Sequence, residues 1–171
     1  MIIRNATSND AKRIREIYEY YVNNTAITFD YDVPTVDDFV ESITRISNNF
    51  PYLVIEDNGY IVGYSYANYF KPRKAYMHTC EVTIYLDNNY KKHGYGKMLY
   101  NELEKRLKEM DIYNLYAAIG KPIEVDKYLN NNSEEFHGHM GYKLAGRFKK
   151  CGYKFDTWYD LIWMDKIIKL W

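Results

Sequence analysis

The sequence predicts an α+β fold in which a mixed, mostly antiparallel sheet is flanked by helices. Two patterns alternate along the chain: apolar residues at every second position, typical of strands, and apolar residues three or four positions apart, typical of helices. Their order is a strand, two helices, three strands, a helix, a strand, a helix and two strands. Because the chain has 171 residues without an internal repeat or a linker, we expect residues 1–171 to form a single domain.

The composition narrows the class of protein. Lys plus Arg and Asp plus Glu both number 23, so the net charge is zero, which argues against a general nucleic-acid binder. No apolar run is long enough to span a membrane, and the N-terminus lacks the long apolar stretch of a signal peptide. Two cysteines, Cys80 and Cys151, are too few for a disulfide framework or a metal set. We expect a cytoplasmic protein with no metal, nucleic-acid or membrane partner.

The N-terminal part is predicted to contain one strand and two helices. Residues 2–4 form a short apolar strand, and Ser8 or Asn9 can cap the first helix. The apolar face of this helix is made of Ile14, Ile17, Tyr18, Tyr21 and Val22. Thr35 and Asp38 have the spacing of a capping box and start a second helix, whose apolar residues are Phe39, Ile43 and Ile46.

Two strands, 52–55 and 60–69, follow and are joined by a hairpin turn at Asp57-Asn58-Gly59, because Asn-Gly readily takes positive φ. The chain holds 20 tyrosines, an unusual number, and many fall in such segments. We interpret these tyrosines as filling half-buried sheet positions, as their strand preference allows.

Residues 81–99 combine three elements that together predict an anion site. Residues 81–86 alternate as a strand, residues 87–89 form a turn, and an apolar helical run starts near Met98. Between turn and helix lies a basic glycine loop, K-K-H-G-Y-G-K. The first amides of a helix lack intrahelical partners and carry part of the helix dipole, so they attract phosphate.

The C-terminal part is predicted to close the sheet. Residues 113–119 form a strand that Gly120-Lys121-Pro122 ends, and residues 133–140 form a short helix that Gly141 stops. Residues 142–148 and 155–164 form an antiparallel pair joined near Cys151-Gly152.

The basic glycine loop resembles the Q/R-x-x-G-x-G/A pyrophosphate loop of the Gcn5-related N-acetyltransferases (GNAT), with Lys91 where Arg or Gln usually stands. The resemblance implies the acyl-CoA N-acyltransferase fold and acetyl-CoA as co-substrate, without a metal. It implies cofactor contacts from Ile84, Tyr85, Leu86, Lys91, Lys92, His93, Gly94, Tyr95, Gly96 and Lys97.

A second motif, N-x-x-S-x-x-F-H-x-x-x-G-Y, runs from Asn130 to Tyr142 and resembles the family segment that holds the pantetheine arm and thiol. The resemblance implies that Asn130 and Ser133 bind the cofactor. The chain carries about seven additional residues, 123–129, just before this motif, which alters the wall near the thiol.

A third motif, F-K-P-R-x-A-Y followed by T-x-E, covers residues 70–81 and resembles the phosphinothricin and methionine sulfoximine acetyltransferases. This resemblance implies a small amino acid-like acid as acceptor and a homodimeric enzyme. It implies that Lys71 and Arg73 bind the anionic end of the acceptor, and that Phe29 and Tyr76 line its side-chain pocket. For the loop residue Phe29, a place in the core is the alternative.

Acetyl transfer to an amine requires a base for the amine, a donor for the oxyanion and a proton for the leaving thiolate. We expect Glu81 to act as the base, an amide near Ile84 as the oxyanion donor and His137 as the acid, with Tyr85 as a rival acid. The alternative for Glu81 is a structural ion pair with Arg73 or Lys74.

Three functions remain open on these residues. The first is acetylation of a small amino acid analogue, and the second is acetylation of a protein N-terminus or ribosomal protein. The third is a coenzyme A-binding sensor without catalytic activity. The presence of Glu81 together with both cofactor motifs favours an enzyme.

Overall fold

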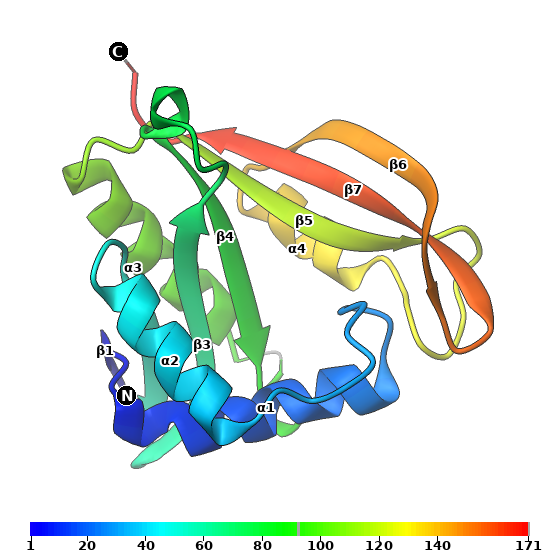
Figure 1. Cartoon of the computed structure of the whole chain (residues 1–171), viewed down its shortest axis with the longest axis horizontal. Coiled ribbons are helices and arrows are strands. Elements are labelled where there is room, and N and C mark those ends of the chain that lie inside the picture. Colours follow the sequence, from blue (N-terminus) through cyan, green and yellow to red (C-terminus); the bar gives the residue numbers. More distant parts are fainter. Residues whose placement is uncertain (92, 171) are drawn as a thin grey trace.

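The computed structural model describes residues 1–91 and 93–170, which form a mixed seven-stranded sheet with helices on both faces (Figure 1). The strand order in the sheet is β1-β2-β3-β4-β5-β7-β6. The elements are β1 (Ile2–Asn5), α1 (Ala11–Asn24), α2 (Val36–Ser47), β2 (Tyr52–Asp57), β3 (Tyr60–Tyr69), β4 (Thr79–Leu86), α3 (Tyr95–Glu109), β5 (Asn114–Pro122), α4 (Asn132–His139), β6 (Lys143–Lys154) and β7 (Thr157–Ile167). The predicted fold class and the predicted order of elements are confirmed.

The one parallel contact among these strands is also the shortest. All other neighbours are antiparallel, whereas β4 and β5 run parallel and pair only at Thr79–Asn114, Cys80–Leu115 and Glu81–Tyr116. Beyond Glu81 the two strands diverge, as the opening between them in Figure 1 shows. Each strand keeps its other neighbour, so the sheet holds together while this gap opens inside it.

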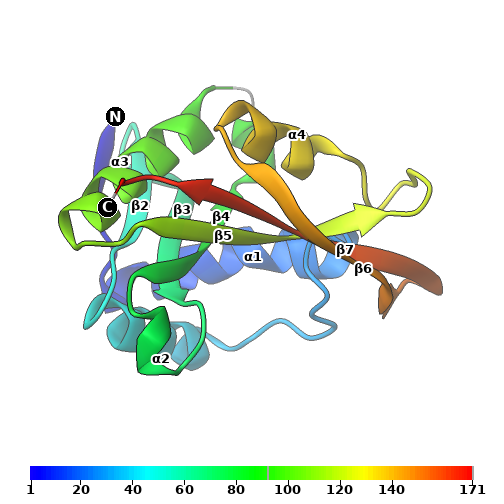
Figure 2. The same ribbon diagram turned by 90° about the horizontal axis from the view of Figure 1, so that it is seen from above.

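The helices cover the sheet in two layers. Figure 2 shows α1 and α2 on one face and α3 and α4 on the other. Ile14 and Ile17 of α1 and Leu99, Leu103 and Leu107 of α3 are buried, as their helical spacing predicts. Met110 continues the same spacing three positions after Leu107, but it is 44% exposed because the helix ends before it.

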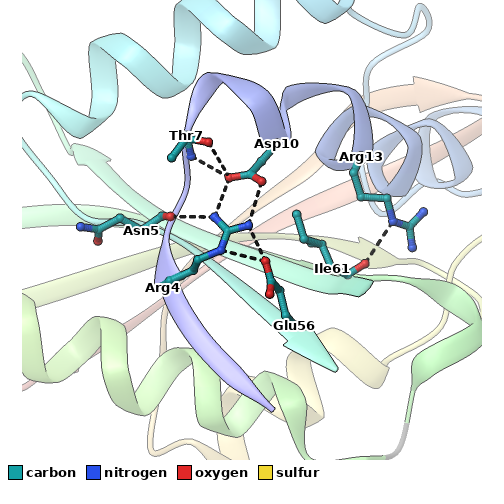
Figure 3. A network of polar contacts seen from close by, with 7 residues as sticks. All are labelled: Arg4, Asn5, Thr7, Asp10, Arg13, Glu56 and Ile61. Carbon is teal, nitrogen blue, oxygen red and sulfur yellow. Dashed lines mark hydrogen bonds and ion pairs between the residues drawn. The ribbon is translucent and has the colours of Figure 1, made fainter. Parts of the chain in front are cut away.

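A polar network fixes the start of α1 against β1 and β2 (Figure 3). The guanidinium of Arg4 donates to both oxygens of Asp10 at 2.8 and 2.9 Å and to Glu56 at 2.8 Å. Asp10 also accepts from the amide of Thr7 at 2.7 Å. Thr7 and Asp10 therefore form the capping box of a short 3-10 turn that leads into α1, and the N-cap residue of α1 is Asp10 and not the predicted Ser8 or Asn9.

Two other local signals are confirmed. The amide of Asp38 donates to the Thr35 hydroxyl at 3.1 Å, and the Asp38 carboxylate accepts from the Thr35 amide at 2.7 Å, which completes the predicted capping box of α2. Asn58 and Gly59 have φ of 50° and 79° in the β2–β3 turn.

Two boundaries near the C-terminus differ from the prediction. β5 continues through Gly120 to Pro122, because pairing with β7 holds these residues extended. The β6–β7 turn lies at Phe155 and Asp156, whose φ values are 52° and 56°, and not at Cys151-Gly152. Cys151 and Gly152 lie inside β6, next to an irregularity in its register with β7.

Candidate active site

A cavity of about 410 Å³ lies where β4 and β5 diverge. It reaches from Tyr18 of α1 on one face of the sheet to His137 of α4 on the other. Glu81 lines it at the apex of the gap, where β4 and β5 last pair, and Ala118 lines it from β5. A ligand in this cavity can therefore contact groups from both layers of helices through the opening in the sheet.

The gap exposes backbone amides of β4. The amide of Asp87 donates to the carbonyl of Val62 at 2.9 Å, which makes these two residues a hydrogen-bonded pair. Because such pairs alternate along an antiparallel ladder, odd-numbered β4 residues bond to β3. The amides of Ile84 and Leu86 therefore point into the gap. They can bond an amide chain such as pantetheine or a developing oxyanion.

The glycine loop presents a helix N-terminus to the wide end of the gap. Gly94 has φ of 78°, and a side chain there would meet no atom within 4 Å. No side chain caps α3, and the amides of Tyr95, Gly96 and Lys97 have no acceptor among the residues that the structure describes. These groups fit a diphosphate, which needs several converging donors and positive potential. Lys92, predicted to contribute here, lies outside the described residues.

Other members of the predicted cofactor set lie nearby. The Lys91 ammonium lies 5.8 and 5.5 Å from the rings of Tyr20 and Tyr21, and the His93 ring stacks on Tyr95 at 5.4 Å. A side chain on Gly96 would come within 3.1 Å of the ring of Phe136, so glycine permits close packing of α3 on α4. The loop is therefore held by packing on both of its sides.

Glu81 is half-buried and faces away from Val82, which packs in the core. Burial raises the pKa of the Glu81 carboxyl, and the nearby charge of Lys71 lowers it in part. No hydrogen bond or ion pair to Glu81 is present among the described residues, so the alternative pairing with Arg73 or Lys74 does not form. A carboxylate in this state has its oxygens available to accept a proton.

His137 is buried and fully hydrogen bonded. Its Nδ1 lies 2.7 Å from the carbonyl of Ser133, and its Nε2 lies 2.9 Å from the hydroxyl of Tyr100. Burial lowers the pKa of His137 to about 4, so the ring is neutral at pH 7. Because the Ser133 carbonyl can only accept, the proton sits on Nδ1 and Tyr100 donates to Nε2.

Residues 3–163 match the family model described as acetyltransferase (GNAT) domain. The chain belongs to the GNAT acetyltransferase family. The phosphinothricin N-acetyltransferase of Streptomyces viridochromogenes is 30% identical over 159 residues, which cover 93% of this chain and 83% of that protein. The L-methionine sulfoximine/L-methionine sulfone acetyltransferase of Salmonella typhimurium is 27% identical, with 96% of this chain and 93% of that protein covered.

A solved structure gives the same result for the fold. The GNAT superfamily phosphinothricin acetyltransferase of Sinorhizobium meliloti, in complex with acetyl-CoA, has a TM-score of 0.88 and 29% identity, covering 97% of this chain and 87% of that chain. This GNAT chain is thus an acetyl-CoA-dependent N-acetyltransferase.

The structure places several predicted residues of this GNAT enzyme away from the cavity. Phe29 does not line it; its ring stacks on Tyr159 at 6.4 Å, and Ile27 of the same loop lines the cavity instead. Tyr76 is 40% exposed and meets the ring of Phe70. Arg73 is exposed, and it too does not line the cavity.

On the cofactor side, Ser133 lines the cavity and Asn130 does not. Asn130 is exposed, and its side-chain oxygen accepts from the amide of Asn132 at 2.9 Å. The additional residues 123–129 fold back on the loop before α2, where the Tyr128 carbonyl accepts from the amide of Ala26 at 3.0 Å. This segment places the buried Leu129 in the cavity wall.

Part of the lining was not predicted from the sequence. Apart from Tyr85, which belongs to the predicted cofactor set, five tyrosines contribute to it: Tyr18, Tyr52, Tyr64, Tyr66 and Tyr100. Two carboxylates, Asp30 and Asp38, also line it and were not predicted. The alternation of Tyr64 and Tyr66 within a strand was a usable signal for a shared aromatic face, whereas the two exposed aspartates have no pattern that distinguishes them.

No helix in the described part of the chain has the length and apolar character needed to cross a membrane.

Proposed function

We propose that this enzyme transfers the acetyl group of acetyl-CoA to the primary amine of a small amino acid-like acid, of the phosphinothricin, methionine sulfoximine or sulfone type. In this proposal the amine attacks directly in a ternary complex, with Glu81 as general base. The observation that carries the proposal is the half-buried Glu81 carboxyl, with its raised pKa, at the apex of the β4–β5 gap. The names of the two relatives support the acceptor class.

Acetyl-CoA supplies the reactive thioester, and the residues of the chain bind and orient it. The first amides of α3 and Lys91 would hold the diphosphate, and the free amides of Ile84 and Leu86 would hold the pantetheine arm and thioester carbonyl. Ser133 lines the cavity on the same side. Lys71, whose charge reaches Glu81, would bind the acceptor carboxylate next to the amine.

In place of the direct donation predicted for His137, we propose that the leaving thiolate takes its proton from the Tyr100 hydroxyl, which His137 orients. Both side chains line the cavity and are hydrogen bonded to each other at 2.9 Å. Because the Nδ1 proton is committed to Ser133, the Tyr100 hydroxyl is the mobile proton of the pair. A Tyr100→Phe variant removes that proton but keeps the ring, and it tests this assignment through the pH dependence of kcat.

We also propose a homodimer that buries the exposed side of the β6–β7 hairpin. Leu144 and Phe148 of β6 and Trp158 of β7 are 60%, 56% and 51% exposed. Apolar side chains of this size, on the edge strand β6 and on its neighbour β7, favour association over solvation.

The test of the activity is release of coenzyme A thiol from acetyl-CoA in the presence of methionine sulfone, methionine sulfoximine, phosphinothricin or an alanine-initiated peptide. We expect turnover with the amino acid analogues. We expect Glu81→Gln to lower kcat about a hundredfold at pH 7, the usual contribution of a general base. Glu41→Gln, an exposed change on α2, is the matched control and should retain full activity.

Each other outcome has a definite meaning. Turnover of the peptide alone would assign the enzyme to protein N-termini. Binding of acetyl-CoA without turnover of any amine would make the chain a coenzyme A sensor. A Glu81→Gln variant with unchanged rate and pH profile would remove Glu81 from the role of base.

A further inference from the structure

The cavity wall carries negative charge, whereas an anionic acceptor needs positive charge. Glu81, Asp30 and Asp38 all line it. Among the described residues that line it, none is Lys or Arg, and the one histidine, His137, is neutral at pH 7. The wall that receives the acceptor therefore carries negative charge beyond that of the proposed base.

The two aspartates belong to the segment that covers the cavity from the α1–α2 side. Asp30 accepts from the Tyr18 hydroxyl at 2.6 Å through Oδ2, and Asp38 accepts from the Thr35 amide at 2.7 Å, also through Oδ2. In both, Oδ1 has no hydrogen-bond partner in the described part of the chain. Each aspartate therefore keeps one carboxylate oxygen for a ligand, and hydrogen bonds from Thr35 lower the pKa of Asp38 further.

The aromatic lining lies next to these carboxylates. Tyr66 stacks with Tyr64 and Tyr52 at centroid distances of 6.5 and 4.7 Å, and Tyr18 meets Tyr85 edge-on at 5.1 Å. Burial raises the pKa of Tyr66, and the charges of Glu81 and Asp30 raise it as well, so the ring lies within the field of both. Tyrosine faces beside carboxylates are a surface that binds cations.

Two further cations near this wall, Lys154 and Arg45, are directed elsewhere. Lys154 is buried and donates to the carbonyls of Thr25 and Thr28 at 2.8 and 3.0 Å, which holds the loop before Asp30. Arg45 is exposed on α2 and does not line the cavity. Neither side chain is placed to receive an anionic group inside the cavity.

We propose that the acceptor is a basic amino acid-like amine, whose side-chain cation lies against Asp30, Asp38 and the ring of Tyr66 while its α-amine faces Glu81. This inference rests on the proposed acetylation of an amino acid α-amine, and it changes the preferred side chain of the acceptor from neutral or anionic to cationic. The α-carboxylate would remain with Lys71 outside the acidic wall. An anionic side chain such as a phosphinate would meet two like charges, so phosphinothricin becomes the poorest member of the proposed class.

The test compares two acceptors of equal length and shape, arginine and citrulline, in which a guanidinium is replaced by a neutral urea. We expect kcat/KM for arginine to exceed that for citrulline by about tenfold, and phosphinothricin to be slower than citrulline, as charge complementarity dictates. Asp30→Asn removes one charge but can still accept from Tyr18. It should reduce the arginine-to-citrulline ratio several-fold.

Asp32→Asn is the matched control, because Asp32 is an exposed acid of the same loop that does not line the cavity; its ratio should equal that of the wild type. Equal rates for arginine and citrulline, or a preference for phosphinothricin, would overturn the inference and leave the proposed function intact. Loss of selectivity in Asp32→Asn as large as in Asp30→Asn would also overturn it. Absence of turnover with every amine would instead refute the proposed function.

Discussion

At Glu81, burial and chemistry make opposite demands on one side chain. Burial raises its pKa above the ordinary value of 4.5, so between pH 4.5 and the folded-state pKa the folded chain binds more protons than the unfolded chain. Ionised Glu81 therefore costs folding stability at neutral pH. The lack of partners that makes burial of this charge costly also leaves the carboxylate free to act as a base beside the acceptor amine.

Because ionised Glu81 lowers the folding stability at neutral pH, a neutral side chain at this position should stabilise the fold. Glu81→Gln should raise the melting temperature at pH 7 while it lowers the rate, because the neutral amide avoids the cost of burying a charge. Its advantage over the wild type should shrink as the pH falls toward 4.5, where the wild-type carboxyl also becomes neutral. Thermal denaturation at pH 4.5 and 7 measures this. A lower melting temperature for the variant at pH 7 would show that Glu81 has stabilising partners.

Residues in motifs with fixed spacing were predictable as site residues, whereas isolated residues were not. Glu81 and His137 lie in motifs with fixed spacing, and the structure places both at the cavity. Asp30 and Asp38 were not predictable, because exposed acids in a loop and a first helical turn usually face only solvent. For Phe29 the sequence left both the acceptor pocket and the core open, and packing against Tyr159 and Gly152 decided for a place away from the cavity.

At the scale of elements, the loop between α1 and α2 is held by the C-terminal hairpin. Lys154 of β6 binds two carbonyls of this loop, and the Tyr31 hydroxyl donates to the carbonyl of Tyr153. The ring of Phe29 lies against Gly152, where an added Cβ would come within 2.4 Å of it. The hairpin therefore positions the loop that carries Ile27 and Asp30 into the cavity.

A glycine substitution tests this contact. Gly152→Ala should destabilise the fold by about 1–3 kcal/mol, the usual cost of overpacking, and should weaken acceptor binding through the displaced loop. Gly146→Ala, in the same strand with no atom within 4 Å of the added Cβ, is the control and should change stability by less than about 1 kcal/mol. Chemical denaturation measures both.

A second variant separates the clash from other effects of the substitution. Phe29→Leu combined with Gly152→Ala shortens the opposing side chain and should recover part of the lost stability. If the double variant lost more unfolding free energy than the two single variants lost in sum, the contact between Phe29 and Gly152 would not explain the effect.

For the molecule as a whole, folding stability at low pH depends on titratable groups whose surroundings in the fold favour one charge state. Burial holds His137 neutral, with a pKa of about 4 against an ordinary value of 6.5. Between these two values the unfolded chain binds more protons, so stability falls as the pH is lowered from 6.5 to 4. Asp10, whose pKa Arg4 lowers, adds a further loss below pH 3.8, while Glu81 changes stability in the opposite direction.

We therefore expect the free energy of unfolding to fall by at most about 3 kcal/mol between pH 6.5 and 4 through His137, since each pKa unit corresponds to about 1.4 kcal/mol. His137→Gln should flatten this part of the pH profile, although it lowers stability overall by disturbing the bonds to Ser133 and Tyr100. His139→Gln, exposed on the same helix, should leave the profile unchanged. Denaturation at several pH values compares the slopes, and equal slopes in all three proteins would contradict the assignment.

The sequence by itself determined the order of elements, the mixed sheet, the helix N-terminus at the glycine loop and the position of Glu81 in the strand before that loop. These depend on periodicity, turn residues and spacing, which are local properties of the chain. The β6–β7 turn and the end of β5 were both predicted wrongly. For β5 the reason is that pairing with β7 holds Gly120 to Pro122 extended against their local preference.

Only the tertiary structure decided what surrounds Glu81. The acidic and aromatic wall combines Tyr18 and Asp30 from the α1–α2 region with Tyr66 of β3, and these segments meet only when the sheet and helices are assembled. Their charges act through space and not along the chain, so no local pattern encodes their sum. The selectivity that we infer for the acceptor is for this reason a property of the folded molecule.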